Sequence, residues 1–229
     1  MNDGSGAQSP SSERIGLILA LVMAAAAVCT AWAGYQSTKW SGVQANSYAE
    51  AGAARTESNR LAIRAGQQRI VDVMTYTQWL NALNEEMLID PSATPGKDYQ
   101  PQDGTISGFI FKRFRLEFRP AVDAWLRTLP FVNPVAPPTP FVMPEYQIAA
   151  DAEADRLDKQ ADAKFEEARD ANQVADNYVL TAVLFALVLF FAGIADRAIG
   201  RRAQRLLLVF AVVGLVTAIG LMLTFPVQL

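Results

Sequence analysis

Residues 178–195 read YVLTAVLFALVLFFAGIA and carry no charged side chain over 18 positions. A helix rises about 1.5 Å per residue, so this run is close to the ~20 residues that cross about 30 Å of hydrocarbon. An acidic, alanine-rich stretch precedes it, and Arg197, Arg201, Arg202 and Arg205 follow it. We therefore expect a transmembrane helix that continues without a break into a water-exposed helical arm.

Two further apolar runs, at residues 15–33 and 206–225, match the first in length. They account for an apolar content of 51%, which is above that of a typical soluble domain. We assign transmembrane helices to residues 13–33, 178–195 and 206–225. The predicted fold class is an all-α membrane protein: three transmembrane helices, a long antiparallel helical hairpin outside the membrane, and a small aromatic, proline-rich cap.

The composition excludes several kinds of chemistry. The chain has no His and a single Cys, Cys29, which lies inside the first apolar run. Metal sites built from His and Cys, Cys-His or Ser-His nucleophile pairs and intrachain disulfides are therefore ruled out. We predict no catalytic residue, no metal and no cofactor. The net charge of −3 argues against a nucleic-acid partner, which usually needs a basic face.

The N-terminal region has two interpretations. Residues 1–12 are polar and predict a disordered cytoplasmic tail before an uncleaved anchor. The alternative is a signal peptide, because Ala31, Trp32 and Ala33 fit a small-x-small cleavage site. The acidic leader and the length of the apolar run favour the anchor.

Residues 34–89 contain no Pro and predict a long helix outside the membrane. Trp32, Tyr35 and Trp40 lie where it leaves the membrane, a usual place for aromatic rings. One stripe of this helix follows the alternating four- and three-residue steps of a coiled-coil seam. The predicted stripe comprises Ala45, Ala49, Gly52, Thr56, Asn59, Ile63, Gly66, Ile70, Val73, Thr77, Leu80, Asn84 and Met87.

Residues 90–144 hold ten of the twelve prolines and predict the cap, with a short helix from about Pro120 to Thr128. Aromatic residues alternate here with basic ones, a pattern that suits nucleic acid, a lipid surface or an acidic partner. The alternative is a small core with a solvated basic rim. The candidate partner- or lipid-binding surface comprises Lys112, Arg113, Arg115, Arg119 and Arg127.

Residues 145–177 predict the returning helix, with ten acidic and four basic side chains on its solvated faces. Its candidate helix-packing seam comprises Ala150, Ala154, Leu157, Ala161, Ala168, Ala171 and Ala175. If both arms start at one membrane level, Glu145 lies beside about Gln67, and the first arm extends further.

The unpartnered end of the first arm carries Ile70, Val73, Leu80 and Met87. We expect the cap aromatics to cover it. These aromatics are Phe109, Phe111, Phe114, Phe118 and Trp125. The rival hypothesis places the aromatic and basic residues on the membrane surface near Trp40 as an amphipathic helix.

The arginines at residues 196–205 predict that this loop is cytoplasmic. It follows that the N-terminus is cytoplasmic, residues 34–177 are extracytoplasmic and the C-terminus emerges outside. Alanine-rich spans, together with an excess of Arg over Lys, suggest a bacterial inner membrane.

Three classes of function remain. The first is a non-enzymatic membrane protein, an oligomeric scaffold or partner-binding stalk whose partner is a second copy or another membrane protein. The second is an oligomeric channel or transport accessory subunit, with the stripe Gly214, Thr217, Leu221 and Thr224 as pore lining or helix contact. The third is a membrane enzyme that uses carboxylates alone, for which the sequence offers no convergent pair.

Overall fold

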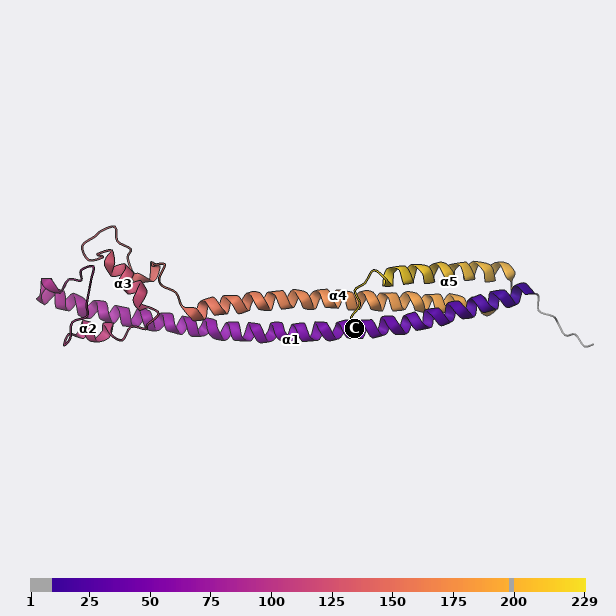
Figure 1. Cartoon of the computed structure of the whole chain (residues 1–229), viewed down its shortest axis with the longest axis horizontal. Helices are drawn as coiled ribbons and strands as arrows, with labels where there is room; N and C mark the ends of the chain where they lie inside the picture. Colours follow the sequence, from indigo (N-terminus) through magenta and orange to yellow (C-terminus); the bar gives the residue numbers. More distant parts are fainter. Residues whose placement is uncertain (1–9, 198–199) are drawn as a thin grey trace, which may run out of the picture. The chain divides into compact units, whose positions relative to one another are not determined.

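The computed structural model describes residues 10–197 and 200–229, and these form helices and loops without a β-strand (Figure 1). The predicted all-α class is confirmed, with three long apolar helices among the elements. In chain order the elements are α1 (Pro10–Ile89), η1 (Pro91–Ala93), α2 (Ile106–Phe111), α3 (Arg119–Arg127), η2 (Pro140–Val142), α4 (Ala149–Arg197) and α5 (Arg201–Met222).

The ends of α1 follow from its prolines. Pro10 is the first helical residue, a position where its missing N–H and fixed φ cost little. After Ile89, the Asp90 side chain accepts a hydrogen bond from the Ser92 N–H, and Pro91 cannot continue the helix. Pro10–Ser12, predicted as part of the tail, are thus helical, whereas residues 1–9 of that tail lie outside the described residues.

Three other helix boundaries differ from the predicted ones. Helix α4 begins at Ala149 and not at Glu145. Helix α5 begins at Arg201, inside the predicted arginine loop, and ends at Met222, before Phe225. Residues 198–199 of that loop lie outside the described residues. The short helix predicted near Pro120 is α3, which carries this proline in its first turn.

The described chain divides into two units, one comprising the described part of Met1–Ala51 with Asp162–Leu229 and the other Gly52–Ala161. Unit 1 contains the apolar parts of α1 and α4 together with α5. Small side chains line its core, which allows helices to approach closely. Its buried members are Leu19, Val22, Ala26, Phe185, Val188, Ala192, Ala195, Ala211 and Ala218.

Three helices are long and apolar enough to cross a membrane: Arg14–Ile89, Ala149–Arg197 and Arg201–Met222. Most of the apolar window in each is not buried within the described chain. Leu21, Val28, Phe190 and Phe210 are examples of large apolar side chains on these outer faces. Such surfaces are compatible with a membrane protein, because lipid can cover them.

The C-terminal segment of unit 1 is held by side chains of α1 and α4. The buried Gln36 amide donates to the Gln228 carbonyl (3.2 Å) and accepts from the Gln228 N–H (2.9 Å). The indole N–H of Trp40 and the hydroxyl of Tyr178 each donate to the Pro226 carbonyl at 3.1 Å. These bonds satisfy backbone groups beyond the end of α5 that would otherwise lack partners.

In unit 2, α1 and the first turns of α4 run antiparallel, as three contacts in reverse order show. Arg69 pairs with Asp151, the Ser58 hydroxyl donates to the Ala154 carbonyl at 2.9 Å, and Arg55 pairs with Asp158. The Ser58 contact has the register expected from placing Glu145 beside Gln67. In unit 1 the same order continues with Ser47 and Glu167, 3.2 Å apart.

The face of α1 that meets α4 is not the predicted one. The residues buried on it are Ser47 and Ala51 in unit 1, and Ala54, Ser58, Ala65 and Asp72 in unit 2. The predicted stripe is offset from these by two residues, and Ile63 and Ile70 on it are 64% and 61% exposed. Two residues turn a helix by about 200°, so the predicted stripe faces away from α4.

The size of the side chains on α1 explains which of its stripes is buried against α4. On α4, Ala154, Ala161, Ala168, Ala171 and Ala175 are buried, whereas Ala150 and Leu157 are half-buried. Alanine and serine on α1 let the two backbones approach these alanines closely, which Ile63 and Ile70 would prevent. We define the outer stripe as seven positions of unit 2 with the predicted spacing, namely the exposed Thr56, Asn59, Ile63, Ile70, Val73 and Thr77 and the half-buried Gly66.

Helices α2 and α3 lie beside the end of α1 in unit 2 (Figure 1), and the side chains between them form an aromatic cluster. Tyr76, Trp79 and Leu83 of α1 pack against side chains from α2, α3 and the turn between them. The other buried members are Phe111, Phe114, Phe118, Ala121, Val122, Trp125 and Leu126. Burying one such aromatic or leucine side chain stabilises a fold by about 1.5–3 kcal/mol, so the cluster is a substantial core.

The proline-rich segment closes this cluster. The ring of Phe141 stacks on Phe118 at 5.1 Å and 4°, and the Trp125 indole N–H donates to the Pro137 carbonyl at 2.7 Å. Two details of the predicted coverage are wrong. Phe109 is 56% exposed and lies outside the core, and Ile70 and Val73 are not covered, whereas Leu80 and Met87 pack against the cluster.

Candidate partner-binding site

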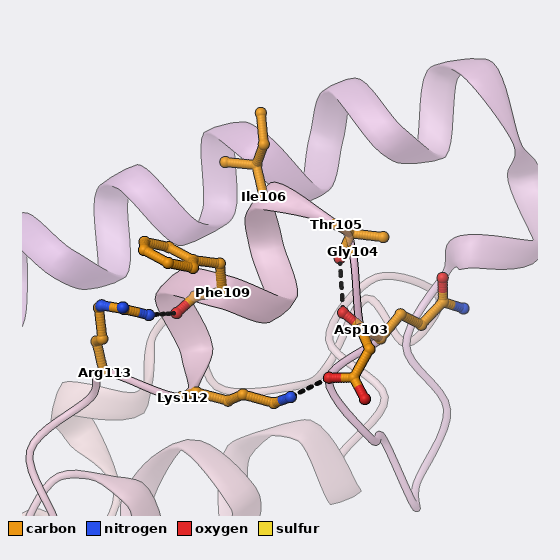
Figure 2. Close-up of a pocket in the computed structure, with 8 residues that line it drawn as sticks. Asp103, Gly104, Thr105, Ile106, Phe109, Lys112 and Arg113 are labelled. Atoms are coloured by element: carbon orange, nitrogen blue, oxygen red, sulfur yellow. Dashed lines mark hydrogen bonds and ion pairs between the residues drawn. The ribbon is translucent and has the colours of Figure 1, made fainter.

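A pocket of about 500 Å³ opens beside α2 in unit 2 (Figure 2). This volume lies within the ~300–1,000 Å³ typical of ligand sites. Its wall is formed by α2, by the loop that precedes it and by the turn that follows it. The lining residues are Gln102, Asp103, Gly104, Thr105, Ile106, Phe109, Lys112 and Arg113.

A tight turn shapes the loop of this pocket. Gly104 adopts a φ of 89°, which side chains other than glycine rarely tolerate. The Thr105 hydroxyl accepts from the Gly108 N–H at 3.1 Å, which caps α2, and donates to the Gln102 carbonyl at 3.1 Å. A Cβ at Gly108 would overlap that same carbonyl oxygen. The pocket therefore depends on two glycines and a capping threonine.

Glu86 of α1 fixes α2 in place. Its carboxylate accepts from the Ser107 N–H at 3.0 Å and from the Ser107 hydroxyl at 2.5 Å. A carboxylate at a helix N-terminus is favourable because the first N–H groups of the helix have no partner within it. These two hydrogen bonds connect α2, which forms part of the pocket wall, to the long helix α1.

The polar groups of the pocket engage one another, as Figure 2 shows. Lys112 forms an ion pair with Asp103, and Arg113 donates to the Phe109 carbonyl at 2.9 Å. The Arg113 guanidinium also lies 3.3 Å from the centroid of the Phe109 ring, a cation–π contact. Phe109 and Ile106 are both exposed. The site therefore offers the Arg113 guanidinium and a Lys112–Asp103 ion pair next to two apolar side chains.

The five predicted basic residues do not form one surface. Only Lys112 and Arg113 line the pocket beside α2. Arg127 is exposed beside a smaller pocket that Lys97, Asp98 and Asp123 also line. Arg119 donates to the carbonyls of Lys112 (2.5 Å) and Phe114 (3.3 Å), so it stabilises the turn between α2 and α3.

Arg115 is directed into the protein. Its Nε and Nη2 atoms each donate to one oxygen of the fully buried Asp72 carboxylate, both at 2.9 Å. The Tyr146 hydroxyl donates to the same carboxylate at 3.2 Å. The hydrogen bonds to Asp72 raise the pKa of Arg115 above its usual value. This guanidinium is therefore committed to balancing a buried charge and is not available as a surface contact.

Sequence reasoning missed the Asp72 network. The signal was present, because Asp72 continues the four- and three-residue steps of Ala54, Ser58 and Ala65. A charged side chain on the buried stripe requires a buried partner, and Arg115 is that partner. Because the stripe with Ile63 and Ile70 was predicted to be buried, the need for a partner of Asp72 was not recognised.

Among residues 14–197 and 200–229, no three His, Cys, Asp or Glu side chains are grouped as a metal ion would need. Comparisons with family models, with curated proteins and with solved structures gave no match. Any functional assignment therefore depends on the geometry of the chain itself.

Proposed function

We propose that this chain is a non-enzymatic, multi-pass membrane scaffold that presents a helical arm and its aromatic cluster to a protein partner outside the membrane. The observation that carries this proposal is the composition of α1. Its first part contains the charge-free run at residues 15–33, and the same uninterrupted helix later carries Arg55, Arg60, Arg64 and Arg69. One helix thus suits lipid at one end and water at the other.

The pocket beside α2 supports a binding role in preference to catalysis. Lys112 is paired with Asp103, and Arg113 lies over Phe109. An acidic partner segment matches this site when its carboxylate replaces Asp103 beside Lys112 and its apolar side chain contacts the exposed Ile106 and Phe109. The channel alternative receives less support, because Gly214 on the proposed pore stripe lies against α4, with Val188 Cγ2 3.1 Å from a Cβ built there.

The proposed orientation is a cytoplasmic N-terminus, an extracytoplasmic arm and an extracytoplasmic C-terminus, in a bacterial inner membrane. The arginines after α4 support it through the positive-inside rule. Both Asn46 and Arg201 are exposed, so a cysteine at either position is reachable by a reagent on its own side of the membrane.

Labelling with a membrane-impermeant maleimide tests this orientation. Single cysteines are introduced as Asn46→Cys and Arg201→Cys in a Cys29→Ser background, in cells whose outer membrane is permeabilised. The proposal expects labelling at position 46 in intact cells and at position 201 only after lysis. Labelling at position 201 in intact cells, or release of the protein from membranes at alkaline pH, would reject it.

A further inference from the structure

The outer stripe of α1 carries apolar side chains that the described residues of the chain leave uncovered. Ile63, Ile70 and Val73 on the stripe, and Met74 next to it, are all exposed. Contiguous exposed apolar side chains mark an interaction surface, and Ile70, Val73 and Met74 are neighbours on this face. The intrachain partner, α4, lies on the opposite face through Ala154 and Ser58.

The spacing of the stripe indicates the kind of partner. Its residues alternate steps of three and four from Thr56 to Thr77, which is the 3.5-residue repeat of two helices wound around each other. None of its seven positions is charged. A face that rested on lipid would not need this repeat, and Arg60 and Arg64 lie beside it.

We propose that the outer stripe binds the outer stripe of a second copy of this chain, in parallel and in register. This inference rests on the proposed function, because insertion into one membrane gives every copy the same direction and the same level. Identical residues then face each other. Apolar Ile63, Ile70 and Val73 meet their own equivalents, and the polar positions meet polar ones.

The polar positions of the stripe favour this arrangement over a shifted one. Asn59 has an amide that can pair with the same amide of the second copy, a device that fixes register in parallel coiled coils. Gly66 lets the two backbones approach between Ile63 and Ile70. A shift of one heptad would place Ile63 opposite Ile70 but leave Asn59 of one copy opposite Gly66 and Asn59 of the other opposite Gly52.

Charges beside the stripe are compatible with a parallel pair. Arg60 forms an ion pair with Glu57 of its own helix at 2.7 Å, and Arg55 pairs with Asp158. The Arg60–Glu57 pair therefore brings an acidic neighbour to the contact, which limits repulsion between two like arms. Binding of a second copy to the outer stripe does not involve the pocket beside α2. Lys112 and Arg113 of that pocket lie in the turn after α2 and not on α1.

Disulfide trapping tests the interface. Ile70→Cys and Val73→Cys are made singly in the Cys29→Ser background, and the full chain in membranes is oxidised and run on a non-reducing gel. Arg64→Cys is the matched control, because it is exposed on the same turn as Ile63 but off the stripe. We expect the two stripe variants to form dimers at least about tenfold faster than Arg64→Cys. Equal rates at all three positions, or no dimer at either stripe position, would overturn the inference.

A second variant tests the same interface without oxidation. Ile63→Asp with Ile70→Asp places two charges on exposed positions, so helix content should be unchanged, whereas the dimer dissociation constant in mild detergent should rise at least about tenfold. An unchanged dissociation constant would count against the interface.

Failure of this inference can be separated from failure of the proposed function. If the chain remains in the membrane fraction with position 46 labelled, but position 70 does not crosslink, only self-association through the outer stripe is refuted. If the chain is not retained in membranes, the proposed function fails.

Discussion

Removing Arg115 should destabilise unit 2 more than any other single change to its charged residues. The substitution Arg115→Ala leaves the fully buried Asp72 carboxylate with the 3.2 Å hydrogen bond from the Tyr146 hydroxyl. Two hydrogen bonds of 2.9 Å are lost together with the compensating charge. Breaking a buried ion pair from one side costs about 3–5 kcal/mol, mainly because the other charge stays buried.

The expected size of the effect differs between variants. Tyr146→Phe removes one hydrogen bond to a charged group and should cost about 1.5 kcal/mol. Arg115→Lys keeps the charge but loses the paired donors, so its cost should lie between these two values. The double variant Asp72→Leu with Arg115→Met replaces the pair by apolar groups and should be much less destabilised than Arg115→Ala.

The assay is urea unfolding in mild detergent, followed by tryptophan fluorescence. With Trp32→Phe and Trp40→Phe, the emission comes from Trp79 and Trp125 of the aromatic cluster. If Arg115→Ala costs less than about 1 kcal/mol, or if the apolar double variant is as unstable as Arg115→Ala, the buried network does not have the role described here.

Three further predictions concern single positions. Burial raises the pKa of Tyr146 to about 12, above the value of 10.0 in an unfolded chain, so stability should be full below pH 10 and fall between pH 10 and 12. Tyr146→Phe should reduce this fall without abolishing it, because burial also raises the pKa of Tyr76 to about 12. Ala168→Leu should cost about 1–3 kcal/mol by overpacking the contact with α1, whereas Ala163→Leu, at an exposed position, should be nearly neutral in thermal melts. Gly108→Ala should increase proteolysis at the loop before α2, whereas Gly96→Ala, which meets no atom within 4 Å, should not.

The sequence was sufficient for the helices and for most of the aromatic cluster. Length and apolar content predict the spans, and Pro120 predicts α3, because these signals act locally along the chain. Phe111, Phe114, Phe118 and Trp125 lie in the core as expected from the need to cover the end of α1. Phe109 does not, because α2 is a single short helix whose opposite face meets Glu86 through Ser107.

The choice of stripe on α1 could not be made from periodicity alone. Both stripes have the same repeat, and the larger side chains of Ile63 and Ile70 made the outer stripe the more apolar one. The partner decides between them, since the alanines of α4 match the small residues Ala54, Ser58 and Ala65 in close contact. Buried Asp72 would have identified the correct stripe only with knowledge that Arg115 reaches it.

The central claim is that α1 is a membrane anchor and a water-exposed arm in one helix. Spin labels on single cysteines in lipid vesicles test it directly, at Leu21 and Val28 in the apolar run and at Arg60 and Arg64 in the arm. The account predicts that labels at the first two positions collide mainly with dissolved oxygen, and that labels at the other two collide mainly with a water-soluble nickel chelate. Equal access of the chelate to all four positions would contradict it.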